Sequence, residues 1–247
     1  RKLMAADTNA AIRGAFAAGA REIVVNDSHG SHTNLRLEDL APGVRLITDT
    51  FKRYGMMQGL DESFDAALFI GYHAKAGSTR GFFAHTGDAN VKDLEIDGRS
   101  VGEGSMNALL AAWYGVPVVL ITGDDVAVEQ FKEFAPNVRG VVVKRAINTR
   151  SGELRPLDEV HREIEIAAHE AVASAHKTMP QRAASVRVKL RFRDTLTPEL
   201  AEILPTMERP APDTIAFSSD SMPHAYSLIR LLYRWINPPP PRSGYDY

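Results

Sequence analysis

Histidines follow two of the apolar segments in this sequence, and each histidine sits where its segment ends. The stretch VVNDSHGSH carries His29 and His32 directly after a short apolar run, and FDAALFIGYHA places His73 after a longer one. Open α/β sheets form their ligand sites at the carboxyl ends of the strands. We therefore expect His29 and His73 to meet at one edge of a sheet. Either histidine alone could equally be a loop residue bound to backbone.

Two further residues have the chemistry of a hydrolytic site. His85 lies in GFFAHTGD, and Glu103 lies between two glycines at the start of a predicted helix. A glutamate in a first helical turn often only complements the helix dipole, but flanking glycines allow a ligand to approach the backbone. Imidazole and carboxylate groups are ligands that zinc accepts. His29, His73 and Glu103 are thus candidate metal ligands, and His85 is a candidate proton-transfer group.

Acidic and amide side chains surround these positions. Asp124 and Asp125 end the apolar segment VPVVLITGDD, and we expect Asp125 to cap the helix that follows. Asn26 and Asp27 precede His29 and could orient its ring from behind. His32 is expected to be a neighbour of His29 on the loop rather than a ligand.

Composition narrows the class of protein. The chain has 247 residues, a net charge of -2 and no cysteine. The near-neutral charge argues against nucleic acid and anionic membranes as partners, and no apolar run reaches the length of a spanning helix. Any metal must be held by His, Asp and Glu, because thiolate ligands are absent. The lack of cysteine also fits a cytoplasmic location.

The elements that must position these residues alternate along the chain. Strands are predicted at 21–27, 44–48, 64–74, 116–125 and 138–146, and helices at 1–20, 102–115, 126–134 and 158–177. Asp97 and Gly98 predict a hairpin turn within 91–101. This order predicts an α/β fold with a mostly parallel central sheet flanked by helices. We expect residues 1–180 to form a metal-binding catalytic domain.

The last part of the chain has a different pattern. SVRVKLRF alternates apolar and basic residues, DTIAFSSD is a further predicted strand, and MPHAYSLIRLLYRWI is a predicted amphipathic helix. Residues 181–247 are therefore expected to form a smaller α/β portion. Four consecutive prolines at 238–241 exclude helix and sheet in the tail, which we expect to be polyproline-like or pinned by a neighbouring subunit.

Four segments, in this order, closely resemble the zinc-dependent D-aminopeptidase family, metallopeptidases of the DppA type. They are VVNDSHG, ALFIGYHAKAG, AHTGD followed by DGRSVGEGSMNA, and VPVVLITGDD. The resemblance extends over nearly the whole chain. It implies that His29, His73 and Glu103 bind zinc and that His85 acts in catalysis. It further implies cleavage of short peptides from the amino end by a zinc-activated water, a preference for D-amino acids, and a homo-oligomer in the form of a decameric ring.

The family pattern also begins with a strand carrying Asp-x-Glu-Gly, and both acids of that motif bind zinc. This sequence starts after that position, and we expect the strand to belong to the full-length protein. Two zinc ions per chain are then expected, against one or none if the two acids are truly absent. Two alternatives remain open at this stage: a metal amidohydrolase acting on L-peptides or small amides, and a metal-free scaffold without catalysis.

Overall fold

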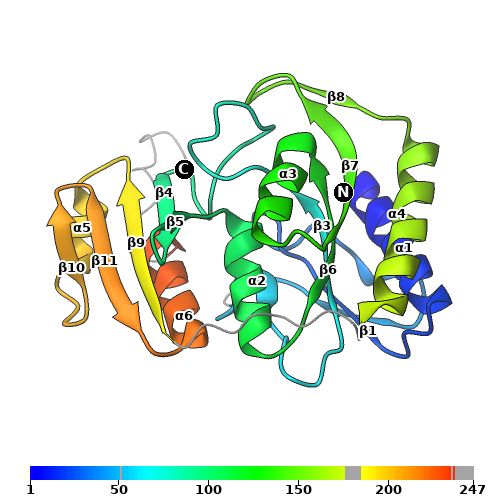
Figure 1. Ribbon diagram of the computed structural model, residues 1–247, viewed down its shortest axis with the longest axis horizontal. Coiled ribbons are helices and arrows are strands. Elements are labelled where there is room, and N and C mark those ends of the chain that lie inside the picture. The colour runs from blue at the N-terminus through cyan, green and yellow to red at the C-terminus, as the bar shows by residue number, and fades with distance from the viewer. Residues whose placement is uncertain (51, 176–184, 235, 237–247) are drawn as a thin grey trace, which may run out of the picture.

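A four-stranded sheet with helices on both faces forms the larger part of the molecule (Figure 1). The computed structural model describes residues 1–50, 52–175, 185–234 and 236. Strands β3 (Ala67–Tyr72), β6 (Val118–Asp124) and β7 (Arg139–Ala146) run parallel, and the short β8 (Gly152–Leu154) pairs antiparallel with β7. The expected α/β fold with parallel strands and flanking helices is confirmed.

Helices cover both faces of this sheet, as the continuous apolar strands require. Helices α1 (Lys2–Ala17) and α4 (Leu157–Ala173) pack together on one face, and α2 (Glu103–Trp113) and α3 (Asp125–Phe134) lie on the other (Figure 1). Neighbouring residues of β6 show the division. Leu120 is buried in the core under α1 and α4, whereas Ile121 belongs to the core shared with α2 and α3.

Strands β1 (Ile23–Asn26) and β2 (Val44–Ile47) form a separate parallel pair, with Ile23 opposite Val44. The parallel strands are thus divided between two sheets, and within the described ranges no strand joins β1 to β3. Two single-turn 3-10 helices, η1 (Leu37–Asp39) and η2 (Gly55–Met57), lie in the loops before and after β2.

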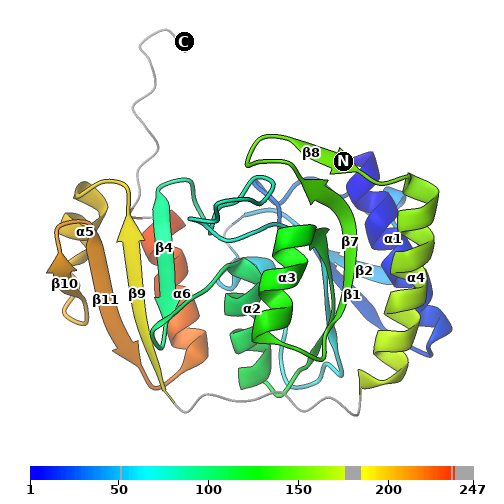
Figure 2. The ribbon, with the colours of Figure 1, turned by 45° about the horizontal axis from the view of Figure 1, so that its top comes forward.

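A five-stranded antiparallel sheet combines segments that are far apart in the sequence (Figure 2). Its order is β10 (Glu208–Ala211), β11 (Thr214–Ser219), β9 (Val186–Phe192), β4 (Val91–Ile96) and β5 (Arg99–Ser100). Because β4 pairs with β9, the two portions expected on either side of residue 180 share a sheet and a core. The division at 180 stays a prediction. Residue 180 and the proline-rich tail lie outside the described residues. The long helix α4 ends at Ala173, earlier than the expected residue 177.

Helix α6 (Met222–Arg234) packs between this antiparallel sheet and the part of the molecule built on the parallel sheet. It contacts β9 and β11 on one side and α2 on the other (Figure 2). The short α5 (Leu196–Ala201) completes the described elements. No helix in the described part of the chain combines the length and apolar character needed to cross a membrane.

The start of α3 corrects one prediction. Asp124, not Asp125, caps this helix, and its carboxylate accepts hydrogen bonds from the backbone N–H groups of Val126 and Ala127 at 3.1 and 3.2 Å. The extended backbone of Asp124, at φ -71 and ψ 164, brings its side chain over the first turn. The Asp125 carboxylate instead accepts from the Ala146 N–H at 2.8 Å and pairs with Arg80 at 2.9 Å.

Candidate metal centre

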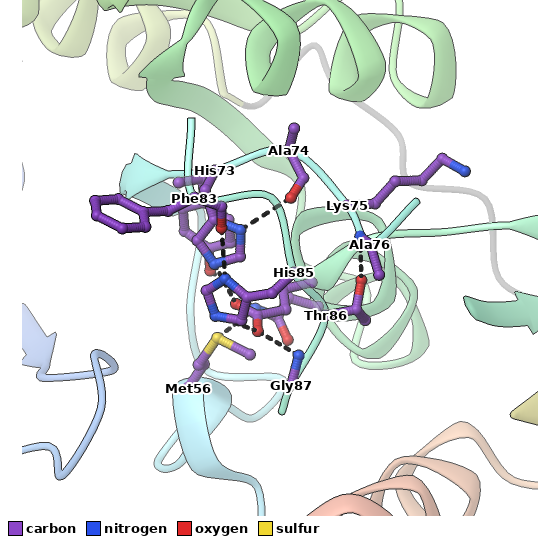
Figure 3. Close-up of polar contacts among 12 residues, drawn as sticks. Met56, His73, Ala74, Lys75, Ala76, Phe83, His85, Thr86 and Gly87 are labelled. Carbon is purple, nitrogen blue, oxygen red and sulfur yellow. Dashed lines mark hydrogen bonds and ion pairs between the residues drawn. The ribbon is translucent and has the colours of Figure 1, made fainter. Parts of the chain in front are cut away.

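Three side chains from separate segments converge at the carboxyl end of β3. His73 follows β3, His85 lies in the loop before β4, and Glu103 is the first residue of α2. One potential ligand atom from each residue lies within 4.8 Å of the other two (Figure 3). The convergence arises because β3 and the start of α2 meet at the sheet edge where open α/β folds place their sites.

Glu103 is at the centre of this group, which we call the metal cluster. Its Oε2 lies 3.2 Å from Nε2 of His73, and its Oε1 lies 3.9 Å from Nε2 of His85. Oε1 also accepts a hydrogen bond from the Gly87 backbone N–H at 2.6 Å. The two imidazole rings stack with their centroids 3.8 Å apart (Figure 3). Glu103 therefore faces both histidines from a fixed position.

Backbone carbonyls fix the tautomer of both histidines. Nδ1 of His73 lies 3.0 Å from the Ala74 carbonyl oxygen, and Nδ1 of His85 lies 2.7 Å from that of Phe83. A carbonyl oxygen only accepts, so each Nδ1 carries the hydrogen. Each Nε2 is then free to bind a metal or a proton on the side of Glu103. Histidines that ligate metals are commonly oriented in this way through their second nitrogen.

The electrostatics favour an ionised carboxylate. Burial alone would raise the pKa of Glu103, but the charges of His73 and His85 and the hydrogen bonds from His73 and Gly87 lower it to about 2. Burial opposes the charge on His73, yet the Glu103 carboxylate and the Ala74 carbonyl outweigh it and raise the pKa of His73. Glu103 is thus a ready anionic ligand at neutral pH.

A buried polar chain holds the first turns of α2. Asn107, one turn after Glu103, donates from Nδ2 to the hydroxyl of Tyr72 at 2.8 Å and accepts from the hydroxyl of Tyr226 at 2.6 Å. Burial, the largest effect, raises the pKa of both tyrosines. Asn107 therefore locks α2 to β3 and α6. Asn107 was not predicted from the sequence, although a polar residue one helical turn beyond a candidate ligand is a visible signal.

The donor set fits zinc. Two imidazole nitrogens and one carboxylate form a recurrent zinc triad that leaves positions open for water or substrate. Their mutual separations allow one ion to lie within bonding distance of all three. The side chain of His85 is 38% exposed, against 16% for His73 and 11% for Glu103, so His85 faces the open side of the group.

His29 lies outside the metal cluster in this structure. It is exposed at the end of β1, where its carbonyl accepts from Asn34 Nδ2 at 2.6 Å. Asp27 accepts from the backbone N–H of His29 at 3.4 Å, whereas Asn26 donates to the carbonyls of Gly55, Met56 and Gln58. The role of His29 as a ligand stays a prediction.

Comparison with known proteins identifies the family. The sequence profile of the D-aminopeptidase family matches residues 1–231. A D-aminopeptidase of Bacillus subtilis (strain 168) is 33% identical over 234 residues, which are 94% of this chain and 85% of the relative. The solved structure of the Zn-dependent D-aminopeptidase DppA from Bacillus subtilis, described as a self-compartmentalizing protease, superposes with a TM-score of 0.89. It is 31% identical, and the match covers 93% of this chain and 84% of that one. The chain therefore belongs to the D-aminopeptidase family and is a metal-dependent aminopeptidase.

Proposed function

We propose that this chain removes the amino-terminal residue of short peptides with zinc as its metal, and that peptides of D-amino acids are its substrates. The convergence of His73, His85 and Glu103 at the end of β3 carries this proposal. The names of the two relatives support zinc and D-amino-acid peptides. His73 and Glu103 act as ligands, and His29 joins them from the end of β1.

Bound zinc would supply a Lewis acid that polarises the scissile carbonyl and lowers the pKa of a water towards neutrality. The chain contributes the geometry around that chemistry. Glu103 holds its charge at neutral pH, because the pKa of its carboxyl lies at about 2. His73 presents Nε2 because its Nδ1 hydrogen is bound by the Ala74 carbonyl.

His85 is assigned the proton transfer to the leaving amine. Its ring is the most exposed of the three, and its Nδ1 hydrogen is bound by the Phe83 carbonyl. Nε2 is then the atom that can carry a proton towards substrate. The ring of His85 stacks on that of His73, so Nε2 of His85 lies beside the proposed ligands. It is 3.9 Å from Glu103, whereas Nε2 of His73 is 3.2 Å from Glu103.

The finer points of the assignment are also proposals. We propose a homo-oligomer, expected to be a decamer, on the strength of the self-compartmentalizing relative and the family resemblance. Two zinc ions per chain require the acids of an Asp-x-Glu-Gly strand, and a cytoplasmic location stays a prediction. Mass determination of the native assembly by light scattering tests the subunit count.

Metal content tests the function itself. We would measure zinc per chain by elemental analysis in the wild type, in Glu103→Ala and His29→Ala, and in Glu95→Ala, which alters a carboxylate on β4 that pairs with Lys189. Zinc in the wild type and control, reduced in the other two variants, together with hydrolysis of D-dipeptides over L-dipeptides, is the expected result. A wild type that neither holds nor takes up zinc would contradict the proposal.

A further inference from the structure

A second group of basic side chains, most of them buried, lies close to the metal cluster. Lys52, Arg230 and His32 are exposed by only 8%, 6% and 6%, and Arg234 lies one turn beyond Arg230 on α6. Lys52 comes from the loop after β2, and His32 from the loop after β1, where it has a positive φ of 61°. We call these four residues the cationic cluster.

The partners of the cationic cluster are neutral. Lys52 donates from Nζ to Asn26 Oδ1 and to the Asp27 carbonyl, both at 2.6 Å, and Arg234 donates to the Gly30 carbonyl at 3.3 Å. Arg230 reaches the hydroxyl of Tyr233 at 3.3 Å. Nε of Arg230 and Nδ1 of His32 are buried without a hydrogen-bond partner in the described part of the chain.

No carboxylate neutralises these cations within the described ranges. None of the ion pairs found there involves Lys52, Arg230 or Arg234. Asp27 and Asp49 act on Lys52 electrostatically without forming an ion pair, and the Asp27 carboxylate already accepts from the backbone N–H groups of Asn34 and Leu35. Buried charge without a counter-charge is costly in free energy, so the cluster calls for an anion.

Contacts lead directly from the cationic cluster to the metal cluster. The Tyr233 ring packs against Gly87, where an added Cβ would lie 2.8 Å from ring atoms, and the Gly87 N–H binds Glu103. The Arg230 guanidinium packs still more closely on Gly55, at the start of η2, where an added Cβ would lie 2.0 Å from Nη1. Met56, the next residue, accepts a hydrogen bond at Sδ from Nδ2 of Asn107, one turn after Glu103, at 3.5 Å. The two clusters are therefore neighbours in the fold.

We propose that Lys52, Arg230 and Arg234 form a carboxylate pocket that binds the free carboxyl terminus of a short peptide substrate. This proposal rests on the proposed function, because it places the peptide's amino-terminal bond at the metal cluster. A guanidinium pairs with a carboxylate through two parallel hydrogen bonds, and Nε of Arg230 is the free donor for such a fork. The pocket would limit efficient substrates to very short peptides with an unmodified carboxyl end.

A matched substrate pair tests the pocket. We would compare kcat/KM for D-alanyl-D-alanine and its carboxyl-terminal amide in the zinc-loaded wild type, in Arg230→Gln and in Arg230→Lys. Arg187→Gln, which removes an exposed cation paired with Glu208, controls for the change in net charge. Hydrogen bonds between charged groups of this kind contribute about 10- to 100-fold in binding.

The expected result is a wild type that prefers the free acid at least about 10-fold. Arg230→Gln should then lose about 30-fold on the acid, through KM, and stay close to wild type on the amide, with partial recovery in Arg230→Lys. Should the Arg230 variants fail to fold, Lys52→Met gives the same comparison. Equal rates for acid and amide in the wild type would overturn the proposal. So would equal losses on both peptides in a folded variant, which would assign the pocket to a carboxylate of the protein itself.

Failure of the proposed function is seen separately. It appears as a wild type that hydrolyses neither peptide and binds no zinc. The pocket is then tested by thermal unfolding of the metal-free protein with each peptide. Stabilisation by the acid but not by the amide, absent in Arg230→Gln, supports the pocket. No difference between the two peptides overturns it.

Discussion

The metal cluster and the cationic cluster are two buried polar groups that share a boundary but differ in their charge balance. In the metal cluster Glu103 faces two imidazoles, and its carboxylate lies 3.2 Å from Nε2 of His73. In the cationic cluster the hydrogen bonds of Lys52 and Arg230 go only to neutral oxygens among the described residues. The first group is satisfied without any ligand, and the second lacks an anion.

The pKa values express this difference. The partners of Glu103 lower its pKa to about 2, so its charge is stabilised despite burial. In the cationic cluster burial and neighbouring cations act together. Burial, opposed by Asp27 and reinforced by Arg230, lowers the pKa of Lys52 to about 8. The pKa of His32 is lowered to about 4, mainly by burial and then by the charges of Lys52, Arg230 and Arg234. The metal cluster is a preorganised set of ligands, and the cationic cluster is a group of cations without a counter-charge. A site that holds a metal and an anionic substrate needs both.

The largest expected effect separates the two histidines of the metal cluster. His73→Ala removes the nitrogen closest to Glu103, and we expect zinc content and kcat/KM to fall together, the latter at least about 1,000-fold. His85→Ala should keep its zinc and lose about 100- to 10,000-fold in kcat, because it removes a proton donor. Elemental analysis and steady-state kinetics on the same preparations give both numbers.

His169→Ala serves as the control, because His169 is an exposed histidine on α4. Loss of zinc in His85→Ala, to the same extent as in His73→Ala, would make His85 a ligand and contradict its assignment as the proton donor. The metal cluster would then be a complete three-residue ligand set by itself.

Local patterns in the sequence predicted most of the elements around these clusters. The Asp97–Gly98 turn is confirmed, with φ of 51° and 77° at its two residues, because an Asp-Gly pair favours this backbone by itself. β8, α5 and β10 were not predicted, since they are too short for a clear periodicity. The pairing of β4 with β9 was also missed, because it joins segments almost a hundred residues apart.

The two clusters differ in how far the sequence predicts them. His73 and Glu103 were singled out because one ends a strand and the other begins a helix, and both positions are visible in the sequence. Lys52 and Arg230 were not, since lysine and arginine are usually exposed and only tertiary packing buries these two. His32 was expected to be a loop neighbour of His29, and its backbone N–H does donate to the His29 carbonyl at 2.9 Å. Its burial against the cations was not predicted.

Substitution of Gly87 tests the contact between the clusters, and we expect its effect on activity to be of intermediate size. An added Cβ would lie 2.8 Å from the Tyr233 ring, at a φ of 73° that strains any residue other than glycine. We expect Gly87→Ala to destabilise the protein by about 1–3 kcal/mol and to lower kcat/KM about 10-fold, because both the Glu103 hydrogen bond and Tyr233 must shift.

Gly77→Ala is a matched control for this variant. Gly77 has a similar φ of 78°, but the nearest atom to an added Cβ is the Lys92 carbonyl oxygen at 3.7 Å. Urea unfolding and kinetics of the two variants separate backbone strain from crowding. Equal activity in both variants would show that the clusters are not coupled through Gly87.

The smallest expected effect is the pH dependence that His32 contributes to stability. Its pKa in the folded protein lies at about 4, below the ordinary 6.5 of the unfolded chain. The unfolded state therefore takes up the proton first as pH falls. The stabilisation is complete above pH 6.5 and is lost between 6.5 and 4. The Glu103 contribution, with a folded pKa of about 2 against an ordinary 4.5, is lost as pH falls from 4.5 towards 2, mostly below that window.

Urea unfolding at pH 7.5 and 5.0 measures this loss. The wild type should lose about 1–2 kcal/mol more than His32→Gln between the two pH values, because the variant has no group that titrates at this position. Acetate at high concentration should reduce the difference, since an anion in the carboxylate pocket favours the charged form of His32. Identical pH profiles for wild type and variant would mean that His32 is not held neutral by the cations, and the contrast between the two clusters would no longer hold.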